Sequence, residues 1–172
     1  MADTNPKDTK TVFLYIIGTV VFLGVLGFVS TGKFPFANFS KENALNQNKV
    51  IDITIKDQVI KAEIADSDPE RQTGLSNRKE LLTDSGMLFV FNQQNIKPAF
   101  WMKDMNFAID IIWINDGKVV QIDEANTEPG VADKSLRIYK PESEIDYVLE
   151  VAKSYASEND IQLGDEVDLS AL

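Results

Sequence analysis

Short apolar runs, each about the length of one β-strand and each bounded by polar turn residues, make up most of the chain after residue 49. Residues 50–55 and 59–65 are rich in β-branched side chains, and the polar tripeptide between them predicts a hairpin. The sequence Asn-Asp-Gly at residues 115–117 is a second hairpin signal. Further strand candidates lie at residues 87–91, 100–102, 109–114, 118–122 and 145–151. This pattern predicts a mostly β domain over residues 50–172, either a compact β-sandwich or a partly open β-barrel.

Two short helices are expected beside these strands. Ser67 can cap a helix that has Pro69 in its first turn, Glu70 as an early acid, and Gly74 after its end. The same stretch does not fit a calcium-binding loop, because its Gly and Glu positions are occupied by other residues. Residues 152–159 form the second helix candidate.

The composition excludes several kinds of chemistry. The chain of 172 residues has neither cysteine nor histidine, so thiolate nucleophiles, Ser-His-Asp triads and His- or Cys-ligated metals are impossible. We therefore predict no metal and no cofactor. From residue 34 onward there are 25 acidic and 14 basic side chains, a net charge of −11. Nucleic acid is not an expected partner, since binding to phosphates needs a basic face.

Residues 11–30 are an uncharged apolar run between Lys10 and Lys33. At 1.5 Å per residue a helix of this length spans about 30 Å, the thickness of the hydrocarbon core of a bilayer. The run predicts a transmembrane signal anchor that follows a short tail at residues 1–10 and precedes a stem at residues 31–49. A cleaved signal peptide is the alternative, but the run is long for one and no Ala-x-Ala-like site follows it.

This layout predicts a single-pass protein of the cell membrane. Positive charges are nearly balanced on the two sides of the apolar run, so the charge bias does not set the orientation. A tail of ten residues before one anchor is the usual arrangement of a signal anchor whose large domain lies outside the cytoplasm. We therefore expect the β-rich domain to be extracytoplasmic.

The sequence Phe-Trp-Met-Lys at residues 100–103 is a candidate binding site. In an extended strand, Phe100 and Met102 share one face while Trp101 and Lys103 share the other. One interpretation is that the first pair is core, Trp101 covers a sheet and Lys103 is solvated. The functional interpretation makes Trp101 a flat platform beside a cation, as suits a sugar or another polar ring.

Asp110 and Glu150 are acidic residues within apolar runs, and each needs a hydrogen-bond donor or a cation if it is buried. Arg71, Arg78 and Lys103 are the available cations. A structural role for Asp110, as part of an ion pair or as an acceptor for the backbone amides of a loop, is favoured over a catalytic one. Two such carboxylates could support glycoside hydrolysis only if they faced each other across a cleft.

A set of short motifs gives the chain a family resemblance. The motifs, in order, are RQTGL (71–75), Arg78 with Leu81, GMLFVF (86–91), FWMKD (100–104), IDII (109–112), YVLE (147–150), and Gly164-Asp165 with Val167. With these motifs the chain resembles, from about residue 50 to residue 169, the uncharacterised family called domain of unknown function 192. The resemblance implies a compact, mostly β domain, often exported or membrane-anchored in prokaryotes, and implies no activity. The family usually has Gly near Lys153 and Ser154, and Pro where this chain has Ala108.

Three functions are compatible with these features. We favour a non-enzymatic module that binds a small polar ligand or an envelope partner. A carboxylate-based hydrolase acting on a sugar-like substrate, with Asp110 and Glu150, is the first alternative. The second is a structural accessory subunit of an envelope complex. The candidate binding residues are Trp101, Lys103, Asp110, Arg71, Arg78 and Glu150.

Overall fold

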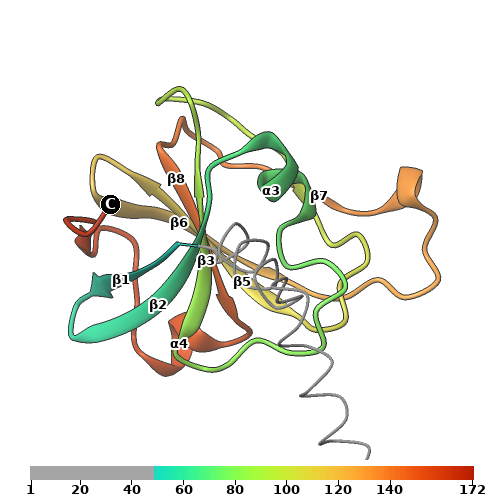
Figure 1. The fold of residues 1–172 in the computed structure, drawn as a ribbon, viewed down its shortest axis with the longest axis horizontal. Helices are drawn as coiled ribbons and strands as arrows, with labels where there is room; N and C mark the ends of the chain where they lie inside the picture. Colours follow the sequence, from blue (N-terminus) through green and yellow to red (C-terminus); the bar gives the residue numbers. More distant parts are fainter. Residues whose placement is uncertain (1–48) are drawn as a thin grey trace, which may run out of the picture. The chain divides into compact units, whose positions relative to one another are not determined.

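The computed structural model describes residues 49–172, in which one curled sheet of seven strands lies beside a two-stranded sheet (Figure 1). The strands are β1 (Val50–Ile55), β2 (Gln58–Ala65), β3 (Ser85–Val90), β4 (Phe100–Trp101), β5 (Ile109–Asn115), β6 (Lys118–Ala125), β7 (Ile138–Tyr139), β8 (Tyr147–Ala152) and β9 (Val167–Asp168). The large sheet has the order β6-β5-β8-β3-β2-β1-β9, and β4 pairs with β7. Neighbouring strands are antiparallel, except that β2 and β3 are parallel.

The two edges of the large sheet are joined at one end. The amide of Val119 in β6 donates to the carbonyl of Asp165 at 2.9 Å, and Gly164 donates back to Val119 at 2.7 Å. Val167, at the start of β9, donates to Gly117 at 2.8 Å. The sheet is therefore a curled half-barrel whose edges meet only locally. The prediction of a mostly β domain is confirmed, with the large sheet curled into a half-barrel.

Each face of the sheet carries its own apolar cluster, because successive side chains on a strand point to opposite faces. One cluster includes Ile53, Leu88 and Leu149 and joins residues from both edges of the sheet, such as Val119 and Val167, so it fills the inside of the curl. The other covers the outer face and includes a second set of fully or nearly fully buried side chains, among them Phe89, Trp113 and Val148.

One helix and several loops cover the outer face. α3 (Asp68–Thr73) lies in the connection between the parallel strands β2 and β3, and its start has the predicted capping box. The amide of Ser67 donates to the Glu70 carboxylate at 2.9 Å, and the Ser67 hydroxyl accepts from the Glu70 amide. Gly74, with φ at +50°, ends the helix. A 3₁₀ turn, η2 (Asp133–Ser135), lies in the long connection from β6 to β7.

The second helix candidate is shorter than predicted. α4 (Tyr155–Glu158) follows Ser154, which has a left-handed backbone with φ at +66°. This is the region where the resemblance implies Gly, the residue that adopts such a conformation without strain. Both predicted hairpins are confirmed, at residues 56–57 and 116–117.

The predicted tail and transmembrane helix lie outside the described residues, as does nearly all of the predicted stem. Within residues 49–172, no helix is long and apolar enough to cross a membrane.

Candidate functional site

A pocket of about 260 Å³ opens on the outer face of the sheet. Its floor comes from β3 and β8, one wall from α3 and the turn after it, and the other wall from the loop that contains β4. Apart from Arg71 and Glu150, the lining side chains are uncharged, and four of them are aromatic. The lining residues are Arg71, Gln72, Thr73, Gly74, Leu75, Ser76, Phe89, Phe91, Pro98, Ala99, Phe100, Trp101, Met102, Met105 and Glu150.

The side chains of the Phe-Trp-Met-Lys segment alternate as predicted. Phe100 points into the outer core, where its ring meets Phe89 edge-on at 4.9 Å and Trp113 at 5.6 Å between centroids. Met102 is buried, whereas Trp101 lines the pocket with 47% of its surface exposed. Trp101 therefore sits at the rim, where a flat apolar surface is available to a ligand.

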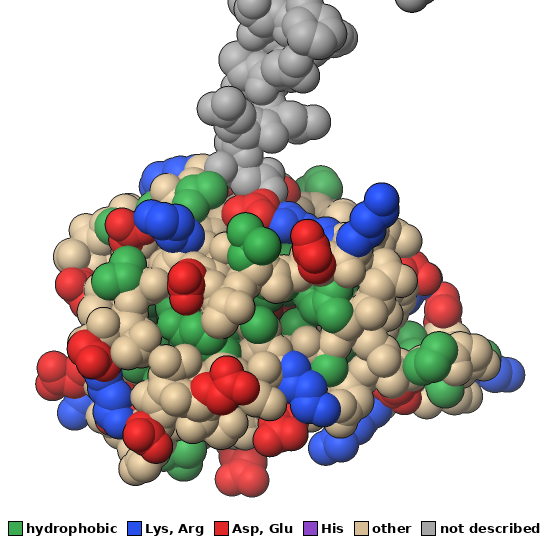
Figure 2. Space-filling model, turned by 90° about the horizontal axis from the view of Figure 1, so that it is seen from below, with side chains coloured by type: hydrophobic (Ala, Val, Ile, Leu, Met, Phe, Trp, Pro, Cys, Tyr) green, Lys and Arg blue, Asp and Glu red, His purple; other side chains and the backbone are tan. Residues whose placement is uncertain are grey.

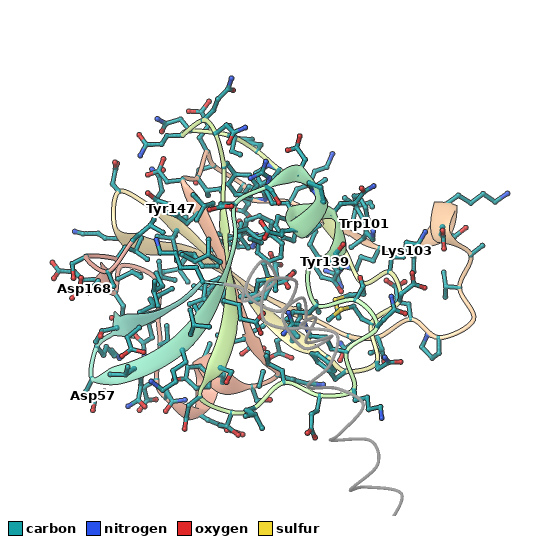
Figure 3. The ribbon with its side chains drawn as sticks, viewed as in Figure 1. Asp57, Trp101, Lys103, Tyr139, Tyr147 and Asp168 are labelled. Carbon is teal, nitrogen blue, oxygen red and sulfur yellow. The ribbon has the colours of Figure 1, made fainter. Side chains whose placement is uncertain are left out.

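Lys103 does not line the pocket. Its Nζ donates to the Asp133 carboxylate at 2.6 Å, and this hydrogen bond raises the pKa of the lysine. Figure 3 shows Lys103 on the same side of the domain as Trp101 and Tyr139, far from Asp57 and Asp168. The ion pair ties the β4 loop to the η2 segment, so Lys103 has a structural partner already.

Glu150 is the charged group on the pocket floor. It lies on β8 between the cross-strand neighbours Met87 and Ile111, and only 7% of its surface is exposed. Burial raises the pKa of its carboxyl to about 8, against the opposing effect of the nearby Arg78 guanidinium. Desolvation outweighs attraction here because Arg78 makes its hydrogen bonds elsewhere.

Both candidate arginines are engaged in structural contacts. Arg78 forms two hydrogen bonds to the carboxylate of Glu63, one of them 2.8 Å long, and does not line the pocket. Arg71 lines the pocket, but its guanidinium donates to the Asp66 and Val90 carbonyls and to the Asp68 carboxylate. Arg71 thus anchors α3 to the end of β3.

Asp110 is not part of the pocket. Its carboxylate accepts hydrogen bonds from the amide of Ser154 at 3.1 Å and from that of Ala156 at 3.0 Å. Burial raises the pKa of Asp110, while these two hydrogen bonds act in the opposite direction. Asp110 thus accepts hydrogen bonds from the backbone of the loop that leads into α4, as its structural interpretation describes.

Asp110 and Glu150 point to opposite faces of the sheet. Glu150 pairs with Ile111 and Asp110 pairs with Val151, so the two carboxylates lie on neighbouring strands in alternate positions. Asp110 has 1% of its surface exposed and belongs to the inner side, whereas Glu150 opens to the outer pocket. They do not face each other across a cleft, and the geometry needed for a pair of glycosidase carboxylates is absent.

The family profile described as DUF192, an uncharacterised family, matches residues 51–169. The chain belongs to the DUF192 family. Comparison with curated proteins found no match. The resemblance seen in the ordered motifs is thus confirmed.

Two solved structures share the fold of this DUF192 domain. A protein of unknown function from Novosphingobium aromaticivorans DSM 12444 is 26% identical, with a TM-score of 0.64 over 72% of this chain and 88% of that one. A candidate transcription regulator from Sinorhizobium meliloti 1021 is 24% identical, with a TM-score of 0.64 over 73% of this chain and 97% of that one.

On the face of the domain shown in Figure 2, acidic and basic side chains are interspersed.

Several pocket residues of this DUF192 domain escaped the sequence reasoning. Phe91 and Met105 line the pocket, as do residues 72–76. The local pattern does not single them out, because the two walls come from segments roughly 25 residues apart that meet only in the folded domain. Of the six candidates, the structure places Trp101, Arg71 and Glu150 at the pocket and the other three outside it.

Proposed function

We propose that this DUF192 domain is a non-enzymatic module that binds a small organic ligand in the pocket on its outer face. The observation that carries the proposal is the combination of aromatic walls, an exposed Trp101 at the rim and the buried Glu150 on the floor. Small-molecule sites are typically concave and apolar, with a few polar groups that set the orientation of the ligand. A catalytic role lacks support, because Glu150 has no second carboxylate among the residues that line the pocket.

Replacing Trp101 by alanine is expected to weaken ligand binding about tenfold, because it removes a large contact surface at the rim. Hits would first be found by a thermal-shift screen of the full chain against cell-wall sugars and metabolites, and their dissociation constants would be measured by calorimetry. Ile138→Ala is the matched control. Ile138 pairs with Trp101 across the two strands and is 49% exposed, yet it does not line the pocket.

The two variants also separate the pocket from a protein interface. Trp101 and Ile138 form an exposed apolar pair, which favours a structural accessory subunit as the second candidate function. Both substitutions would weaken the binding of a partner protein that contacts this pair. A screen without hits, together with envelope-extract binding that Trp101→Ala leaves unchanged, would refute the proposal of a pocket ligand.

We also propose that residues 11–30 anchor the protein in the cell membrane with the DUF192 domain outside the cytoplasm. The support is the uncharged run of 20 residues, which as a helix is long enough to span the hydrocarbon core of a bilayer. We expect the full chain to remain in the membrane fraction at high salt, and protease added to intact cells to digest the domain. A mature mass that lacks the first ~30 residues would instead establish a cleaved signal peptide.

A further inference from the structure

We propose that the pocket selects a small organic cation, with an apolar body held by the aromatic walls and an ammonium group bound by Glu150. This inference rests on the proposed function and adds the chemical class of the ligand. It predicts a preference for positive charge that an apolar pocket alone would not have.

The first support is the state of the Glu150 carboxyl. Within residues 49–172, no side chain or backbone group donates a hydrogen bond to the Glu150 carboxyl, although only 7% of the surface of this residue is exposed. Buried carboxylates nearly always have such partners. The side that lacks them is the side that opens to the pocket, so a ligand with N–H donors would satisfy the group.

The second support is the absence of a competing cation on the pocket floor. Arg78 is a charged neighbour that acts on Glu150, and its guanidinium is bound by both carboxylate oxygens of Glu63. Arg71 is held by two carbonyls and Asp68. An anionic ligand would therefore meet an acidic group and two arginines whose hydrogen bonds are already directed elsewhere.

The third support is the chemistry of the walls. The faces of aromatic rings attract cations, most strongly where water is excluded. Phe91 already makes such a contact, with the Arg71 guanidinium 5.9 Å from its ring centroid. From the β4 loop the pocket is lined only by uncharged side chains, including Trp101 and Met105. The wall formed by the β4 loop thus offers no counter-charge for an acid and no cation that would repel an amine, and Arg71 on the opposite wall has its guanidinium bound by two carbonyls and Asp68.

Ligand binding should release a proton. Glu150, with a pKa of about 8, holds a proton in the empty pocket near neutral pH. An ammonium ligand stabilises the carboxylate, so the proton leaves the carboxyl oxygen for the buffer when the ligand binds. As pH rises toward 8, affinity for the amine is expected to increase by up to about tenfold per pH unit. Above pH 8 the affinity should level off. The charged groups near Glu150 are Arg78, Glu63 and Arg71.

The test uses three ligands with the same aromatic body and different charge: phenethylamine, 2-phenylethanol and phenylacetate. Their dissociation constants for the full chain would be measured by calorimetry between pH 6 and 8. We expect phenethylamine to bind at least about tenfold more tightly than the alcohol, and phenylacetate to bind most weakly. Glu150→Gln should abolish both the preference for phenethylamine over 2-phenylethanol and the pH dependence of amine binding.

Equal binding of the three ligands, or tighter binding of phenylacetate, would overturn the inference and leave the pocket function intact. A preference for the amine that Glu150→Gln does not reduce would also overturn it. Failure of all three to bind, with neutral or anionic hits from the wider screen that Trp101→Ala weakens, would reject the cation and keep the proposed function. Absence of any pocket ligand would reject both.

Discussion

Glu150→Gln is expected to stabilise the domain, by about 3 to 5 kcal/mol at pH 8 and by almost nothing below pH 4.5. Most substitutions of buried residues destabilise. This one removes a group that is costly to ionise in place, because burial raises the pKa of its carboxyl from 4.5 to about 8. Glutamine has nearly the same shape as glutamate, but its amide does not ionise.

The direction of this pH dependence follows from the number of protons that the folded and unfolded states bind. Between pH 4.5 and 8 the unfolded chain releases the Glu150 proton while the folded domain keeps it. The free energy of unfolding of the wild type therefore falls as pH rises through this window, by at most about 1.4 kcal/mol per pH unit. Above pH 8 both states are ionised and this contribution is constant.

Urea unfolding of the full chain and the Gln variant at pH 5, 6, 7 and 8 would measure the difference. Glu80→Gln is the matched control, because Glu80 is exposed, and its curve should run parallel to the wild type. A constant difference between the Glu150 variant and the wild type across this range would contradict the prediction. The expected gain also implies that this acid is retained at a cost in stability, which fits a binding role.

Asp110→Ala is expected to lower the free energy of unfolding by about 3 kcal/mol, since it leaves one buried and one part-buried backbone amide without an acceptor. Those amides belong to Ser154 and Ala156, at the turn into α4. Ser154 has a left-handed backbone, a conformation unfavourable for a residue other than glycine, and the Asp110 carboxylate helps to hold it. The loss should appear in urea unfolding and as faster hydrogen exchange at the two amides.

Asp110→Asn is the control that distinguishes the loss of the hydrogen-bond acceptor from the loss of the negative charge. The asparagine carbonyl can accept from one of the two amides, so we expect about half the loss seen with alanine. A loss below ~1 kcal/mol for Asp110→Ala, or unchanged exchange at residues 154 and 156, would show that Asp110 does not organise this turn.

Much of the fold could be predicted from local sequence. The hairpin turns, the capped helix after Ser67 and the outward side of Trp101 all depend on residues close to one another in the chain. Turn residues, caps and alternation act over a few positions, and there the physical rules are strong. The family followed from the order of short motifs along residues 51–169.

The roles of the two acidic residues required the tertiary structure. Alternation placed Asp110 on one face of its own strand, but only the register between β5 and β8 sets Glu150 on the opposite face. A shift of one residue in that pairing would have put both on the same side. The register is set by packing among residues some 40 positions apart, which no local pattern records. The sequence alone determined a β-rich DUF192 domain, and the tertiary structure decided that Glu150 faces a pocket while Asp110 holds a turn.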